Sequence, residues 1–140
     1  MSENQDADTE TTDQLTFQNP ATRYPSIEPP VQHQDEPGLD ADLEPKADLG
    51  EHSYRGTGRL TGRRALITGG DSGIGAAVAI AFAREGADVA IHHLPDEEPD
   101  ARAVAEIIER EGRTAALIPG DLTDRAFCES LADTAVKRLG

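Results

Sequence analysis

The sequence contains few aromatic residues and a single cysteine. Its 140 residues include no Trp, two Tyr and three Phe, so any hydrophobic core must be built mainly from aliphatic side chains. The lone Cys128 cannot form a disulfide bond within the chain. No apolar run approaches the roughly 18 to 20 residues that a membrane span requires, and the acidic, polar start of the chain shows no secretory signal. The sequence therefore predicts a cytoplasmic protein that is not embedded in a membrane.

Basic residues are also scarce. The chain has 13 Lys and Arg against 27 Asp and Glu, which gives a formal net charge of -14. Nucleic acids and anionic membranes carry negative charge themselves, so neither is expected as the main partner. The four histidines and one cysteine show no metal-ligand spacing, and no metal site is expected.

The first 50 residues account for much of the negative charge, with 12 acidic and 2 basic residues. They also contain six of the nine prolines. Such a segment buries too little apolar surface to offset its chain entropy. We expect an acidic, Pro-rich arm over residues 1–58, extended or disordered, a hinge at 54–59 and a folded domain over 59–140. The arm either only solubilises the protein or lies along its own domain or a neighbouring subunit. In the second case, its spaced apolar anchors would be Phe17, Tyr24, Ile27, Leu39 and Tyr54.

Short apolar runs alternate with helical periodicity after residue 59. Residues 65–68, 89–91 and 115–118 are expected to form buried parallel strands. A helix is expected after each strand, and the order βαβαβα predicts an α/β fold with right-handed crossovers, the N-terminal half of a doubly wound parallel sheet. The helical residues expected to face the core are Ile74, Val78, Ala81, Phe82, Ala101, Val104, Ile107, Ile108, Phe127, Leu131, Ala135 and Leu139.

Polar residues mark the expected helix ends. Asp96 is expected to cap the second helix, and Thr123 or Asp124 the third. Cys128 is expected on the inward face of the third helix, as a packed thiol rather than a nucleophile. Ser130 is expected to be buried in the same helix.

A glycine-rich segment, residues 68–75, joins the first expected strand to the first helix. A dinucleotide-binding loop requires this strand-to-helix context. Gly69 would make the tight turn, Gly73 would let the backbone approach a pyrophosphate, and Gly75 would let the helix pack close to the strand. The phosphates would meet free N–H groups at the positive end of the helix. A nucleoside triphosphate loop is excluded because two alanines follow the last glycine; the alternative is that the glycines serve only a tight turn.

This segment resembles the cofactor motif of the short-chain dehydrogenases/reductases, Thr-Gly-x-x-x-Gly-x-Gly, at all four fixed positions. Residues 120–123 are similar to the family's Asp-Val/Leu segment, whose Asp meets the adenine amino group. Parts of the arm, at 17–20, 37–39 and 53–56, resemble the extended N-terminus of a bacterial subgroup of general-stress or aldehyde-reductase-like oxidoreductases. The resemblance implies a Rossmann-type fold and hydride transfer between a nicotinamide cofactor and a small alcohol or carbonyl. The implied cofactor-binding residues are Thr68, Gly69, Asp71, Ser72, Gly73, Ile74, Gly75, His93, Asp121 and Leu122.

The choice between NADP and NAD depends on the end of the second strand. An acidic residue there would bond a free ribose 2′-hydroxyl and repel a 2′-phosphate. The position falls near His93, and His92, His93 or the Ser72 hydroxyl could donate to a phosphate, which favours NADP. Alternatively, both histidines are only polar residues at a strand end, and Asp96 could serve the ribose, which keeps NAD open.

The catalytic motifs of the resembled family do not occur in this sequence. The family uses a Tyr-x-x-x-Lys pair with a Ser upstream, and no Tyr follows Tyr54. We therefore assign no catalytic residue and expect the chain to be the N-terminal cofactor-binding part of an oxidoreductase, inactive by itself. The family implies that the full-length protein is a homo-oligomer, a tetramer. The alternative is a non-catalytic dinucleotide-binding or interaction module that acts through a partner subunit.

Overall fold

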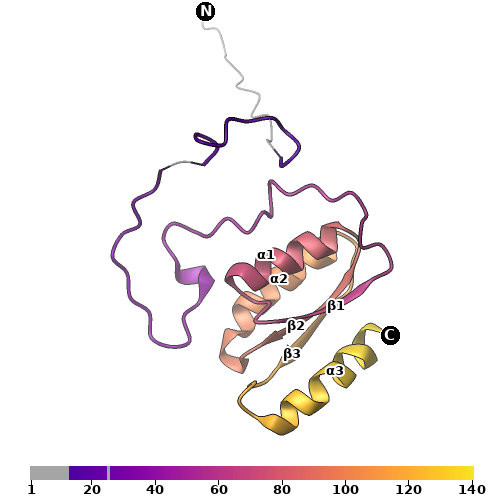
Figure 1. The fold of residues 1–140 in the computed structure, drawn as a ribbon. Coiled ribbons are helices and arrows are strands. Elements are labelled where there is room, and N and C mark those ends of the chain that lie inside the picture. Colours follow the sequence, from indigo (N-terminus) through magenta and orange to yellow (C-terminus); the bar gives the residue numbers. More distant parts are fainter. Residues whose placement is uncertain (1–12, 25) are drawn as a thin grey trace, which may run out of the picture.

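The computed structural model describes residues 13–24 and 26–140 of the chain (Figure 1). Within them, the predicted βαβαβα order is confirmed, with two short 3-10 turns added. No helix in this part of the chain is long and apolar enough to cross a membrane. The elements are η1 (Asp40–Asp42), β1 (Arg64–Thr68), α1 (Gly73–Arg84), β2 (Asp88–His93), η2 (Pro95–Glu97), α2 (Glu98–Arg110), β3 (Ala115–Pro119) and α3 (Arg125–Leu139).

The three strands form a parallel sheet in the order β1-β2-β3. Figure 1 shows α1 and α2 on one face of the sheet and α3 on the other. In β2, Val89 and Ile91 face the core under α1 and α2, whereas Ala90 faces α3. The alternation arises because successive strand residues point to opposite faces. The sheet is therefore covered on both faces, as the continuous apolar strands predicted.

Helix α1 buries a different face from the predicted one. Ile74 is 86% exposed and Phe82 is 36% exposed, while Val78 and Ala81 are half-buried. Nearly every residue of this helix is apolar, so periodicity does not select a face. The mostly small side chains that pack against the sheet and α2 are Ala76, Ala79, Ile80 and Ala83.

Two identical substitutions on α1 test this orientation. Ile80 is completely buried, so Ile80→Ala is expected to lower the free energy of unfolding by about 2–5 kcal/mol. Ile74→Ala, at an exposed position, is expected to change it by less than about 0.5 kcal/mol. Urea unfolding of the two variants measures the difference, and equal losses would contradict the orientation.

The buried faces of α2 and α3 match the prediction more closely. Val104 and Ile108 of α2 belong to the core under α1, with Ile107 half-buried against it. Leu131 of α3 is buried with Ala135 against β2 and β3. Of the other residues predicted to face the core from these two helices, Ala101 is buried, and Phe127 and Leu139 are half-buried.

Three local predictions about these helices are wrong. Asp96 does not cap α2, because Pro95 starts the turn η2 and Glu97 takes the cap position. Cys128 is exposed and its thiol donates to the Leu122 carbonyl at 3.1 Å. Ser130 is also exposed. Cys128 and Ser130 each lie one position from a core residue of α3, and one helical position rotates a side chain by about 100°, which turns both away from the core.

Asp124 is the residue that caps α3. Its carboxylate accepts hydrogen bonds from the backbone N–H groups of Ala126 and Phe127. This decides between the two candidates that the sequence left open, because Thr123 precedes the cap position.

Only part of the described arm contacts the domain. Leu49 packs against the core under α1 and α2, whereas the Gln14 side chain bonds the backbone of Arg55 within the arm itself. Two of the predicted anchors, Leu39 and Tyr54, are half-buried. The other three do not anchor the arm, since they are largely exposed: Phe17 (101%), Tyr24 (69%) and Ile27 (61%).

Candidate functional site

The glycine-rich loop lies where the parallel strands end. Thr68, the last residue of β1, pairs with His92 of β2, and the Gly70 N–H donates to the His92 carbonyl at 3.1 Å. The Gly120 N–H donates to the His93 carbonyl at 3.0 Å, which ties the segment after β3 to the same edge. The structure therefore brings the predicted loop, the end of β2 and the segment after β3 together.

Two glycines of the loop are required for different reasons: close packing at Gly75 and backbone conformation at Gly73. A Cβ on Gly75 would lie 1.8 Å from the Gly69 carbonyl oxygen, so the first turn of α1 touches the turn after β1. Gly73 has a φ of 50°, in the left-handed region, and no heavy atom lies within 4 Å of where its Cβ would be. The loop thus packs tightly at Gly75, whereas the space next to the Cα atom of Gly73 is open.

The start of α1 presents backbone donors on this open side. The first N–H groups of a helix have no partner within the helix. Ser72 occupies the N-cap position in an extended conformation, and its side chain makes no capping hydrogen bond. The Ile74 side chain is largely exposed. Backbone N–H groups and the positive end of the helix dipole therefore meet at a surface that can accept an anion.

The carboxylates at this edge differ in their surroundings. Asp71, within the loop, is 2% exposed, and its Oδ1 has no hydrogen-bond partner among the described residues. Asp121 is exposed, and hydrogen bonds from Thr123 lower the pKa of its carboxyl group. The neighbouring Leu122 is 43% exposed. In the described residues, no cluster of three or more His, Cys, Asp or Glu is arranged to hold a metal ion.

His92 joins the loop to the segment after β3. Its Nδ1 accepts a hydrogen bond from the Gly69 N–H at 3.4 Å, and its Nε2 lies 3.2 Å from the Gly120 carbonyl, to which it donates. The imidazole also lies 5.5 Å from the ring of Phe127. These contacts define one neutral tautomer with the hydrogen on Nε2. Both nitrogens are engaged by backbone groups, so His92 has no free donor for a phosphate in this arrangement.

His93 is completely buried at the end of β2. Its Nδ1 lies 2.8 Å from the Leu94 carbonyl, which only accepts hydrogen bonds, so this nitrogen carries a hydrogen. Its Nε2 lies 3.2 Å from Oε2 of Glu98, although the two groups are not aligned as a hydrogen bond. Glu98 also pairs with Arg102. The imidazole is therefore enclosed by protein groups at the place where the sequence analysis expected a cofactor contact.

Two acidic residues that the sequence analysis missed hold the arm to this edge. Oδ2 of Asp40, in η1, accepts a hydrogen bond from the Gly73 N–H at 2.8 Å. The backbone N–H groups of Asp40 and Ala41 donate to the carboxylate of Asp100, in the first turn of α2, at 2.6 and 3.2 Å. Asp100 is 5% exposed. An acidic residue in a first helical turn is ordinarily solvated, so the sequence carried no signal for this contact.

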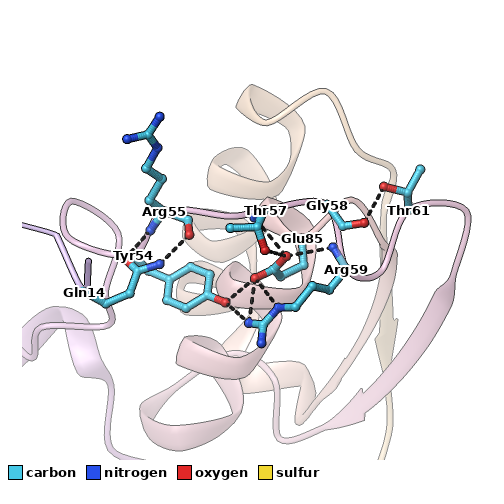
Figure 2. Close-up of polar contacts among 8 residues, drawn as sticks. All are labelled: Gln14, Tyr54, Arg55, Thr57, Gly58, Arg59, Thr61 and Glu85. Atoms are coloured by element: carbon cyan, nitrogen blue, oxygen red, sulfur yellow. Dashed lines mark hydrogen bonds and ion pairs between the residues drawn. The ribbon is translucent and has the colours of Figure 1, made fainter. Parts of the chain in front are cut away.

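A second polar cluster lies at the opposite end of α1. Figure 2 shows the Glu85 carboxylate surrounded by groups of residues 50–59, the linker through which the arm leads to β1. It accepts from the Tyr54 hydroxyl, from the Thr57 and Arg59 N–H groups at 3.0 and 2.9 Å, and from the Arg59 guanidinium at 2.7 Å. Glu85 is 3% exposed. The segment predicted as a hinge is therefore fixed to the domain.

The same contacts shift three pKa values. Hydrogen bonds from Arg59 and then from Tyr54 hold the pKa of Glu85 far below its ordinary value. The hydrogen bond to Glu85 raises the pKa of Tyr54, and Glu85 likewise raises the pKa of Arg59. Glu85 is thus a buried anion that is stabilised by charge and by backbone donors.

The sequence model of one protein family matches residues 63–140, more than half of the chain. It describes the short chain dehydrogenases. The chain belongs to this family. A crystal structure of a short chain dehydrogenase from Burkholderia cenocepacia J2315, in complex with NADP, is similar with a TM-score of 0.55 and 44% identity, covering 59% of this chain and 33% of that one. The predicted Rossmann-type fold of the N-terminal half is thereby confirmed.

Two relatives from Bacillus subtilis extend the similarity. Uncharacterized oxidoreductase YhxD of Bacillus subtilis is 57% identical over 122 residues, 87% of this chain and 41% of that protein. This alignment is longer than residues 63–140, so it includes part of the arm. General stress protein 39 of the same bacterium is 41% identical over 117 residues, 84% of this chain and 41% of that protein. The chain spans about two fifths of the length of these relatives, and the predicted resemblance to the general-stress subgroup is confirmed.

Proposed function

We propose that this chain forms the dinucleotide-binding half of an oxidoreductase that moves a hydride between a nicotinamide cofactor and a small alcohol or carbonyl. The observation that carries the proposal is the loop, in which Gly75 contacts the turn after β1 while no heavy atom lies within 4 Å of where a Cβ on Gly73 would be. A pyrophosphate fits this place, because the helix supplies N–H donors and no Cβ obstructs them. When bound, the nicotinamide gives or accepts the hydride.

The proposed contacts follow the position of each group in the loop. The N–H groups of Gly73 and Ile74 bind the pyrophosphate, whereas the Ser72 hydroxyl is a donor for the 2′-phosphate of NADP. Asp121 accepts from the adenine amino group, and Leu122 packs against the base. Thr68 and Gly69 shape the turn, Asp71 is buried within the loop, and the enclosed ring of His93 forms a wall near the ribose.

We propose that the cofactor is NADP and not NAD. No acidic residue ends β2, and the similar Burkholderia structure contains NADP. Because the nitrogens of both histidines contact protein groups, the Ser72 hydroxyl is the donor left for a 2′-phosphate in this proposal. For the whole protein, we propose a small alcohol or carbonyl substrate and a homo-oligomeric state, and both proposals are supported by the family relationship. This chain supplies no catalytic residue in the proposal.

Calorimetric titration of the 140-residue chain with NADPH and with NADH tests the proposal. We expect saturable binding of both and tighter binding of NADPH. Ser72→Ala is expected to weaken NADPH binding about tenfold, as for the loss of a hydrogen bond to a charged group, and to leave NADH binding unchanged. No heat with either cofactor at millimolar concentration would overturn dinucleotide binding. Tighter binding of NADH would overturn the preference for NADP.

A further inference from the structure

The arm places a carboxylate on a backbone donor that the proposed cofactor would use. Asp40 belongs to the turn η1, and its Oδ2 lies 2.8 Å from the Gly73 nitrogen. Gly73 is the first residue of α1, so its N–H belongs to the group of donors that a bound pyrophosphate meets. An anion from the chain itself is therefore already paired with the helix N-terminus.

The position of Asp40 is fixed by contacts on both sides of it. The buried carboxylate of Asp100 receives the N–H groups of Asp40 and Ala41. The Gln34 side chain holds Leu39, accepting from its N–H at 2.7 Å and donating to its carbonyl at 3.1 Å. Asp40 is therefore held at the loop by a built turn and does not depend on its bond to Gly73 alone.

Asp40 and a phosphate cannot share this donor on equal terms. One N–H forms one strong hydrogen bond, and two anions beside the same helix end repel each other. A carboxylate at a helix N-terminus is itself stabilising, so its displacement costs free energy that cofactor binding must supply. We propose that the arm is an autoinhibitory element of the dinucleotide site, in which Asp40 competes with the cofactor pyrophosphate for the start of α1. This inference rests on the proposed function.

The test compares two charge-removing variants of the same turn in the full chain. Asp40→Asn removes the competing anion but keeps the size of the side chain. Asp42→Asn removes the same charge two residues away, from an exposed side chain of η1, and serves as the matched control. Each protein is titrated with NADH and with NADPH by calorimetry, at about 20 mM and about 500 mM NaCl, because salt screens the repulsion between exposed charges.

We expect Asp40→Asn to bind both cofactors about three- to tenfold more tightly than the parent chain, in the range of a charge at a helix N-terminus. The gain should shrink at high salt, and Asp42→Asn should bind like the parent chain. A urea midpoint equal to that of the control would show that the gain does not come from changed folding.

The outcomes separate this inference from the function on which it rests. Binding of the cofactors with equal or weaker affinity in Asp40→Asn overturns autoinhibition and leaves dinucleotide binding in place. An equal gain in Asp42→Asn also overturns it, because the effect would then come from net charge and not from the contact with Gly73. Absence of binding in all three proteins overturns both the proposed function and the competition.

Discussion

A Gly75→Ala variant is expected to unfold at a much lower denaturant concentration and to lose dinucleotide binding. The added Cβ would lie 1.8 Å from the Gly69 carbonyl oxygen, which is a backbone atom and cannot rotate away. The start of α1 must then move off the turn, and overpacking of this kind costs about 3 kcal/mol or more. The same movement shifts the N–H groups that are proposed to meet the pyrophosphate. Urea unfolding and calorimetry measure the two effects.

Gly38→Ala is the matched control for this substitution. A Cβ on Gly38 would come closest to Oε1 of Gln34, at 3.2 Å, which is a side-chain atom that can shift by a small amount. We expect its free energy of unfolding to stay within about 0.5 kcal/mol of the parent chain. A Gly75→Ala variant as stable as this control would show that the close approach of helix and turn is not required.

A Glu85→Gln variant is expected to lose much of the stability of the linker and of the end of α1. The amide nitrogen of Gln is a donor and would face the donors of Arg59 and Tyr54. A buried charged network is strongly destabilised when one partner is removed, because the remaining groups stay desolvated. The variant should therefore unfold at a clearly lower urea concentration at pH 7.

The same variant should also change how stability depends on pH. Glu85 has a lower pKa in the folded chain than its ordinary value of 4.5, so its ionised form stabilises the fold above that pH. The contribution is lost as the pH falls below about 4.5, towards the folded pKa. Urea midpoints measured from pH 7 to pH 3 should therefore fall more steeply for the parent chain than for Glu85→Gln.

Glu129→Gln provides the control for both measurements. Glu129 pairs with Arg125 at 2.7 Å on the exposed surface of α3, where an ion pair contributes little. Its pH profile should run with that of the parent chain. Parallel profiles for Glu85→Gln and the parent chain would contradict the assignment of a shifted, stabilising carboxylate to Glu85.

The loop and the order of elements could be predicted because their signals are local. Glycines at fixed spacing, an apolar run before them and a helical pattern after them all lie within the segment that they describe. The strand β2 is longer than predicted, because His92 and His93 are polar residues that bond to backbone groups at the strand end, His92 through both ring nitrogens and His93 through Nδ1. Polarity alone therefore placed the strand end too early.

The contacts of the arm could not be predicted because they are long-range. Asp40 meets Asp100, 60 residues later, and Gly73, 33 residues later. Glu85 meets Arg59, 26 residues earlier. Each of these acidic residues, considered alone, has the pattern of a solvated surface charge. The predicted inward face of α1 was also wrong, because an almost uniformly apolar helix carries no periodic signal for its orientation.

The contacts of Arg84 and Glu85 also decide where the folding unit begins. Arg84 donates to the carbonyls of Gly50 and Tyr54 at 3.0 and 2.6 Å, while Glu85 binds the N–H groups that follow along the linker. Residues 50–59 belong to no helix or strand, and these bonds satisfy part of their backbone. If the linker opened, the end of α1 would lose its partners. We therefore expect the linker and α1 to unfold together, so that residues 50–58, assigned to the arm by composition, would belong to the folding unit of the domain.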